Sequence, residues 1–402
     1  MAIGKSTLIA AVNLLATIFL LSLLGGQLVS WTVRPGIVLY PHDVLLVVLI
    51  IWAYAKNAIV GTRVKLLYPL YAFLFAAIAS LLLNLFQFGR LEILAGSLYL
   101  VRWFVYAEAY VLIASARATF PWLRLLYVVS VLFALFGFIQ YFFYPDLRNL
   151  QYLGWDPHYW RLFSTLLDPN FAGIILVLGF LLGLAMWQYK KIRPMLVLSQ
   201  VGLLGAILLT YSRSSYLAFL GSTVTFALVT KRTSLGLGLL IIFFVSIAVL
   251  PLRDVDILRI DRAETAIARL GNWERSMELI RGSPVFGYGF NTLRFLQAKR
   301  GLISDTSIVS RAGAGVDNSF LFILATTGIV GLVAYLSILN AMVLFGRESM
   351  KRDIAGAVLI ASVVGISIHA FFINSLFYPW VMLWLWILVG SVERQSEASD
   401  DR

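Results

Sequence analysis

Long apolar runs, separated by short polar segments, dominate the pattern of this chain. A helix needs about 20 apolar residues, at ~1.5 Å of rise each, to cross ~30 Å of hydrocarbon. Since a backbone inside lipid has to satisfy its own hydrogen bonds, we predict that these runs are helices. The pattern therefore predicts an all-α polytopic membrane protein, with residues 1–402 in a single transmembrane domain. The twelve predicted transmembrane helices cover residues 7–26, 43–60, 66–87, 93–115, 122–143, 170–188, 195–211, 214–230, 234–250, 319–345, 354–372 and 376–392.

The composition supports this interpretation. Hydrophobic residues make up 60% of the chain and charged residues 13%, whereas a soluble domain has roughly 45–50% apolar and about 25% charged residues. The chain has no cysteine, and its three histidines, His42, His158 and His369, lack the spacing of a metal-binding motif. We therefore expect neither a metal site nor a cofactor.

The distribution of basic residues predicts the orientation in the membrane. Twelve spans place both termini on one side, and most of the lysines and arginines in short loops lie on that side. The short loops opposite hold only Arg34, Arg90, Arg148 and Arg161. By the positive-inside rule both termini are cytoplasmic. We expect a multi-pass membrane protein.

The net charge of +12 has two interpretations. It is typical of nucleic-acid binding, or of cytoplasmic loops combined with sites for anionic ligands. The basic residues are spread along loops between spans and form no soluble basic domain. We therefore favour the second interpretation and expect no nucleic-acid partner.

Residues 251–316, between the ninth and tenth spans, form the only large loop, which we predict to be periplasmic. Within it, residues 263–282 predict an amphipathic helix that Gly282 and Pro284 end. Such a helix lies on the membrane surface or covers a cavity between spans. Its apolar positions recur at spacings of three and four: Ile267, Leu270, Trp273, Met277 and Ile280.

Arg213 is the clearest candidate for a binding residue. It lies between two apolar runs and is flanked by hydroxyl side chains from residues 210–215. One interpretation is a turn charge that reaches water. The other is an anion site, because a guanidinium suits phosphate oxygens and a nearby helix N-terminus adds N–H donors.

Other polar residues near predicted spans have two interpretations each. Arg102 and Glu108 lie within the fourth span and are either structural or part of a site. Asp168 is a predicted N-cap of the sixth span, with Pro169 as its first residue. Asp317 precedes the tenth span and is either an N-cap or a general base.

The chain contains no nucleotide-binding glycine motif, since the GYG at residues 287–289 matches neither GxGxxG nor GxxxxGK[ST]. Arginines and a carboxylate on the outer side would suit a lipid-linked pyrophosphate, with its prenyl tail between helices. We therefore expect membrane lipid to be a partner.

Four segments in order resemble the O-antigen ligase and polymerase superfamily of bacterial envelope glycosyltransferases. RLFSTLLDPNFAG resembles a family segment that runs from an arginine to a Pro-Asn pair. LLTYSRSSYLAFL resembles a turn of that family that contains an arginine. The loop and the start of the following span are similar to RLGNWERSMELIRGSPVFGYGFNTLRF and DNSFLFILATTGIVGL. Together these segments lie within residues 161–333.

The resemblance implies a metal-independent, inverting transferase of the GT-C type on the periplasmic face of the bacterial inner membrane. It would move a glycan from undecaprenyl pyrophosphate to an acceptor hydroxyl. Arg213 would hold the pyrophosphate, and Arg269 would stabilise its developing charge. We further predict that substrate binding involves Arg161, Arg262, Arg275 and Asn318.

The residue before Asn318 departs from the ligase pattern, because Asp317 stands where ligases have a histidine. Some polymerase-like members also carry aspartate there. The resemblance therefore favours an O-antigen or exopolysaccharide polymerase, with Asp317 as the base and a glycan as acceptor. The alternatives are a ligase that joins glycan to a lipid A core, or a protein-glycosylating relative. From a different class, a transporter or flippase also fits twelve spans.

Overall fold

The computed structural model of the chain is 76% helical with almost no sheet, which confirms the all-α class. It describes residues 5–34, 37–56, 58, 64–116, 120–189, 193–250, 261–303 and 315–400. One small element was not predicted from the sequence. Strands β1 (Trp31–Arg34) and β2 (Ile37–Leu39) form an antiparallel hairpin.

Each of the twelve predicted apolar runs holds one helix, and the described residues of the 251–316 segment form two further helices. Short 3-10 turns occur at Leu23–Leu28, Arg148–Leu153 and Ser164–Leu166 (η1, η2 and η3). The helices are α1 (Lys5–Ser22), α2 (Pro41–Ala55), α3 (Leu67–Leu83), α4 (Arg90–Ala114), α5 (Trp122–Phe143), α6 (Pro169–Tyr189), α7 (Pro194–Leu209), α8 (Arg213–Val229), α9 (Thr233–Val249), α10 (Asp261–Gly282), α11 (Leu293–Lys299), α13 (Ser319–Ser349), α14 (Ala355–Ala370) and α15 (Pro379–Asp400).

Four helices of the described part are long and apolar enough to cross a membrane: α4, α5, α6 and α13. Shorter apolar helices include α2, α3, α7, α9 and α14. The chain is thus a multi-pass membrane protein. That all twelve apolar helices cross the bilayer stays a prediction.

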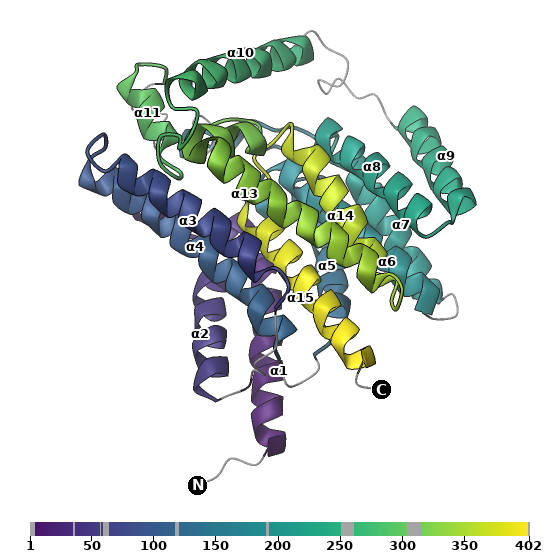
Figure 1. The fold of residues 1–402 in the computed structure, drawn as a ribbon. Helices are drawn as coiled ribbons and strands as arrows, with labels where there is room; N and C mark the ends of the chain where they lie inside the picture. Colours follow the sequence, from purple (N-terminus) through teal and green to yellow (C-terminus); the bar gives the residue numbers. More distant parts are fainter. Residues whose placement is uncertain are drawn as a thin grey trace.

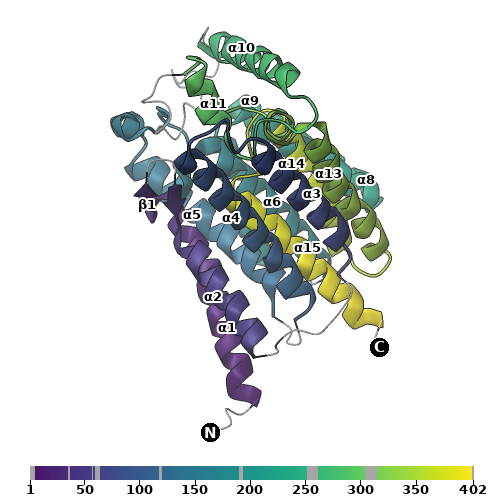
Figure 2. The same cartoon turned by 60° about the vertical axis from the view of Figure 1, so that its left-hand side comes forward.

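The helices form a bundle with distinct ends. The N- and C-termini lie at one end, and α10 and α11 lie across the opposite end (Figures 1 and 2). In the interior α8 packs on α14, α15 packs on α4, and α13 packs on both α3 and α14. Large aromatic side chains such as Trp103, Trp380 and Phe219 are almost fully buried among them.

A break in α13 fixes the segment that follows α10. Gly328 has φ +66° within the helix, where α13 kinks. The backbone after α10 enters this break, because Ile329 N–H donates to the Pro284 carbonyl and Tyr288 N–H donates to that of Ala325. The GYG segment is therefore an anchor between helices, which explains its glycines without a nucleotide.

Two polar residues of α4 have partners that lie far away in the sequence. The buried Arg102 pairs with Asp43 of α2, with 2.9 Å between guanidinium and carboxylate. Glu108 instead accepts a hydrogen bond from the Tyr54 hydroxyl at 3.2 Å. The two α4 residues are therefore not paired with each other. Both residues thus have structural partners within the protein, and Arg102 also lines the cavity described below.

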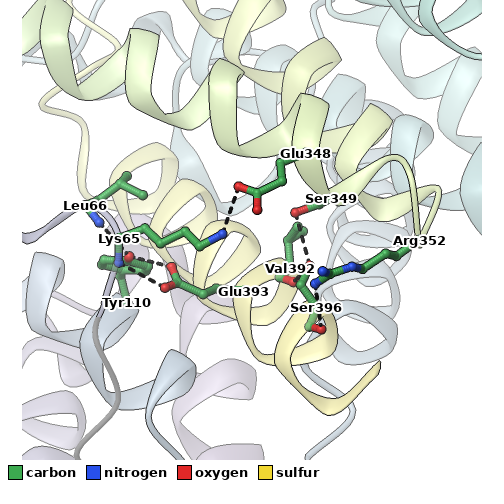
Figure 3. Close-up of polar contacts among 9 residues, drawn as sticks. All are labelled: Lys65, Leu66, Tyr110, Glu348, Ser349, Arg352, Val392, Glu393 and Ser396. Atoms are coloured by element: carbon green, nitrogen blue, oxygen red, sulfur yellow. Dashed lines mark hydrogen bonds and ion pairs between the residues drawn. The ribbon is translucent and has the colours of Figure 1, made fainter. Parts of the chain in front are cut away.

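At the terminus end, polar contacts join α15 to its neighbours (Figure 3). The buried Glu393 carboxylate accepts from the Tyr110 hydroxyl and from the backbone N–H of Lys65. Lys65 in turn pairs with Glu348 of α13 at 2.8 Å. These groups satisfy one another's hydrogen-bonding requirements, so their role at this end of the bundle is to hold the helices together.

Candidate functional site

A cavity of about 860 Å³, lined by both polar and apolar residues, lies beneath α10 and α11. These two helices lie at the end of the bundle away from the termini (Figure 1). Asn272 and Arg275 of α10 and Arg294 of α11 contribute to its wall. The amphipathic helix thus covers a cavity, which is one of the two placements predicted for it. Its buried face differs from the prediction in detail: Met277 is 41% exposed, whereas Leu279 and Ile280 are buried.

The charged residues of the cavity come from separate elements. Arginines enter from the helices: Arg102 from α4, Arg275 from α10 and Arg294 from α11. Carboxylates enter from the segments just before helices: Asp156, Asp168 and Asp317. Such an arrangement can bind an anion with guanidinium groups and accept a proton on a carboxylate in the same space.

Asp317 lines this cavity, and its neighbour Asn318 caps the helix. The Asn318 side-chain oxygen accepts from the N–H groups of Phe320 and Leu321, at 2.9 and 3.0 Å. The N-cap interpretation of Asp317 is therefore wrong, since the position one residue later fills that role. The general-base and substrate-binding roles of Asp317 and Asn318 stay predictions.

Asp168 caps α6, as the sequence predicts. Its Oδ1 accepts from Asn170 N–H at 2.7 Å and from Phe171 N–H at 3.4 Å, and Pro169 is the first helical residue. Burial raises the pKa of the Asp168 carboxyl, while these N–H groups and the nearby Arg161 oppose the shift. The cap thus fixes one carboxylate at the edge of the cavity.

Asp156 is a cavity carboxylate with a raised pKa. The residue is exposed and lines the cavity. Desolvation by the protein around it raises its pKa to about 6, with further contributions from Asp168 and Asp317 and an opposing one from Arg161. The sequence analysis missed Asp156, although the aromatic, proline-containing loop around it was visible in the sequence.

A metal ion is one ligand that this corner of the cavity would admit. Ligand atoms of Asp156, His158 and Asp168 lie within 4.8 Å of one another. Against a metal, the Arg161 guanidinium lies 3.4 Å from His158 Nδ1, so a positive charge is already present. Burial, and secondarily Arg161, lower the pKa of His158 to about 3, so its imidazole is neutral. The group thus consists of two carboxylates and a neutral imidazole beside one guanidinium.

Arg161 lies behind the cavity wall and holds the turn that precedes Arg213. Its Nε donates to the Thr210 carbonyl at 2.9 Å, and a second nitrogen donates to the Tyr211 carbonyl at 3.3 Å. These are carbonyls at the C-terminus of α7, which lack helical partners. Arg161 therefore satisfies protein acceptors, and the substrate-binding role predicted for it stays untested.

The segment with Asn170 and the segment with Arg213 meet in the structure. The Asn170 side-chain oxygen accepts from the Ser212 hydroxyl at 2.7 Å, and Ser212 caps α8 through Ser215 N–H. Since Asn170 lines the cavity, this contact places the start of α8 next to it. Arg213 is the first residue of α8 and is exposed, and it is not among the described residues that line the cavity.

A buried polar chain connects this turn with the start of α13. His369, fully buried in α14, lies 3.4 Å from the Ser215 hydroxyl and also contacts that of Ser375. The Ser319 hydroxyl, at the first residue of α13, accepts from Leu376 N–H just beyond Ser375. His369 thus helps to position both segments. The sequence analysis missed it, because a lone histidine in an apolar run carries no signal of its partners.

The two remaining predicted site residues lie on α10. The backbone of Arg262 and Arg269 is helical, but their side chains lie outside the described residues. Their predicted roles are therefore untested, whereas Arg275 on the same helix lines the cavity.

Comparison with known proteins gives one family match. Residues 198–336 match a family model described as O-Antigen ligase. The matched region extends from α7 to α13 and includes Arg213, Arg269 and Asp317. No curated protein matches the chain.

Proposed function

From the match of residues 198–336 to a family model described as O-Antigen ligase, we propose that this chain belongs to the O-antigen ligase and polymerase superfamily and is a metal-independent, inverting glycosyltransferase. The donor is a glycan on undecaprenyl pyrophosphate, and the acceptor is a hydroxyl of a second glycan. The reaction takes place on the periplasmic face of the bacterial inner membrane, and both termini are cytoplasmic. The product is a longer lipid-linked polysaccharide.

The observation that carries this proposal is that arginines and carboxylates line the same cavity under α10. The arginines come from α4, α10 and α11, of which Arg102 on α4 is already paired with Asp43. The carboxylates come from the starts of α6 and α13 and from the loop before η3. A transfer from a diphosphate needs both kinds of group, because negative charge grows on the leaving oxygen while a proton leaves the acceptor. Termini and cavity lie at opposite ends of the bundle, in agreement with the proposed orientation (Figure 1).

The chemical step joins the acceptor oxygen to the anomeric carbon of the donor. The bond from this carbon to the diphosphate oxygen breaks, and undecaprenyl pyrophosphate leaves with the electron pair. Attack from the opposite side inverts the anomeric configuration. Arg213 and Arg269 hold the diphosphate, Arg161, Arg262, Arg275 and Asn318 contribute to the substrate-binding region, and a cavity carboxylate takes the acceptor proton. The resemblance singles out Asp317 for that last role.

The position of Asp317 favours the polymerase over the ligase. Ligases resembled by this chain have a histidine there, while Asn318 here supplies the cap and leaves the Asp317 carboxylate at the cavity. A transporter is disfavoured, since the polar cavity carries the charges needed for diphosphate transfer and the matched family is one of ligases.

The test uses purified protein in lipid vesicles with lipid-linked repeat units as the only substrate. We expect a ladder of longer lipid-linked glycans, at a rate that a metal chelator leaves unchanged. Single units that persist until a lipid A core is added, and are then moved to it, would establish the ligase instead. Uptake of lipid-linked units without elongation would establish a transporter.

A further inference from the structure

The loop that carries Asp156 is held in place on both sides. Before it, Gly154 takes a left-handed conformation (φ +82°), and its N–H donates to the Gln151 carbonyl at 2.9 Å. After it, Leu147 N–H donates to the His158 carbonyl at 2.8 Å, and Trp160 N–H donates to that of Pro145 at 2.9 Å. Asp156 therefore reaches the cavity from an anchored loop, which is what a catalytic group requires.

The other two carboxylates of the cavity already interact with the protein. Asp168 accepts a hydrogen bond through Oδ1 and so caps α6. Asp317 takes part in a polar or electrostatic interaction with another group of the protein. Asp156 makes no hydrogen bond or ion pair with any residue of the described part of the chain. Asp156 is exposed and lines the cavity, so its carboxylate is available to a hydroxyl of the acceptor.

From this geometry we propose that Asp156 is a catalytic residue, which accepts the proton of the acceptor hydroxyl as that oxygen attacks the donor. The proposal rests on the proposed function and identifies the base within it. Asp168 and Asp317 then act as neighbouring anions that increase the proton affinity of Asp156. The proton moves from the acceptor oxygen to an Asp156 oxygen, and the electron pair of the broken bond leaves with the diphosphate.

The charges that face Asp156 support this assignment. Anionic groups come from Asp168 and Asp317, and positive charge on the same loop comes from Arg161, beside the neutral His158. The more distant guanidinium groups of the cavity wall belong to Arg102, Arg275 and Arg294. A base works best when its pKa is near the working pH. The pKa of Asp156, raised to about 6, meets this condition.

The test compares Asp156→Asn with wild type in vesicles, with lipid-linked repeat units as substrate. We expect kcat to fall by roughly 10²-fold or more, with little change in KM for the donor, because asparagine keeps the shape but cannot take a proton. In wild type, kcat should fall as the pH drops below about 6, since the protonated carboxyl is no longer a base. Asp156→Asn should lose this acid limb, and Asp156→Glu should retain it at reduced rate.

Asp146→Asn is the matched control, since Asp146 begins the same loop but pairs with Arg148 at 2.8 Å and does not line the cavity. It should transfer at the wild-type rate, and melting temperatures should show that all variants are folded. If wild type is active and Asp156→Asn keeps its rate and its acid limb, Asp156 is not the base, while the proposed function stands. A folded wild type that transfers no glycan overturns both.

Discussion

The Arg161 guanidinium donates to the main-chain carbonyl of Thr210, with 2.9 Å from Nε to oxygen. This bond crosses from the loop before α6 to the C-terminus of α7, three residues before Arg213. The same guanidinium also reaches the Tyr211 carbonyl and His158 Nδ1. One side chain thus joins the first family-like segment to the second and fixes the turn from which Arg213 extends.

Arg161→Lys tests this positioning role. A lysine keeps the charge but cannot reach three acceptors with one rigid fork. We expect the free energy of unfolding to fall by about 1–3 kcal/mol, as buried carbonyls lose their donors, and glycan transfer to slow. Arg148→Lys is the control, because Arg148 forms an exposed ion pair outside the cavity. Equal melting temperatures and rates for both variants would contradict the role of Arg161.

Substitutions at Asp317 and at Asn318 test separately the proposed chemical role of the first residue and the capping role of the second. Asp317→Asn removes a carboxylate from the cavity and leaves the cap intact, so transfer should fall while the melting temperature stays constant. Asn318→Ala should lower the melting temperature and destabilise α13 by about 1 kcal/mol, since two N–H groups lose their acceptor. If Asp317→Asn melts earlier than Asn318→Ala, the assignment of the cap is wrong.

Local signals in the sequence were enough to predict the helices and one cap. Apolar runs, Asp168–Pro169 at the start of α6 and Gly282 at the end of α10 act within a few residues, and the structure confirms them. The sequence could not decide which of two neighbouring residues caps α13. Asp317 and Asn318 are both good N-caps, and only the backbone register shows that the second one fills the position.

Contacts between distant segments left no local signal. The partner of Arg102 is Asp43, 59 residues away, whereas the candidate within the same helix, Glu108, bonds to Tyr54. Asp156 likewise owes its raised pKa first to desolvation and then to Asp168 and Asp317, which only the fold brings near. From sequence alone, a carboxylate in a loop cannot be distinguished from a solvated surface charge. The sequence analysis therefore names only Asp317 as a candidate base.

Gly328→Ala tests the anchor that holds α10 over the cavity. Gly328 has a positive φ, and a Cβ there would overlap the Val285 carbonyl, which is backbone and cannot turn aside. We expect a lower melting temperature and loss of transfer, since the segment after α10 must leave the break in α13. Gly202→Ala in α7 is the control, because its Cβ would meet no atom within 4 Å. There, alanine should stabilise the helix by up to ~1 kcal/mol.

Arg213→Lys addresses the proposed grip on the diphosphate. Arg213 is the first residue of α8, beside a turn that Asn170, Ser212 and Arg161 hold rigid. Lysine retains the positive charge but offers no planar pair of donors to the phosphate oxygens. Transfer should therefore fall by roughly 10²-fold or more, with an unchanged melting temperature because the side chain is exposed. Arg232→Lys is the matched control, since Arg232 stands at the N-cap position of α9, beyond the other end of α8, and is also exposed. If both lysine variants transfer glycan at the wild-type rate, the diphosphate is bound without Arg213, and the arginines on α4, α10 and α11 that line the cavity become the groups that hold it.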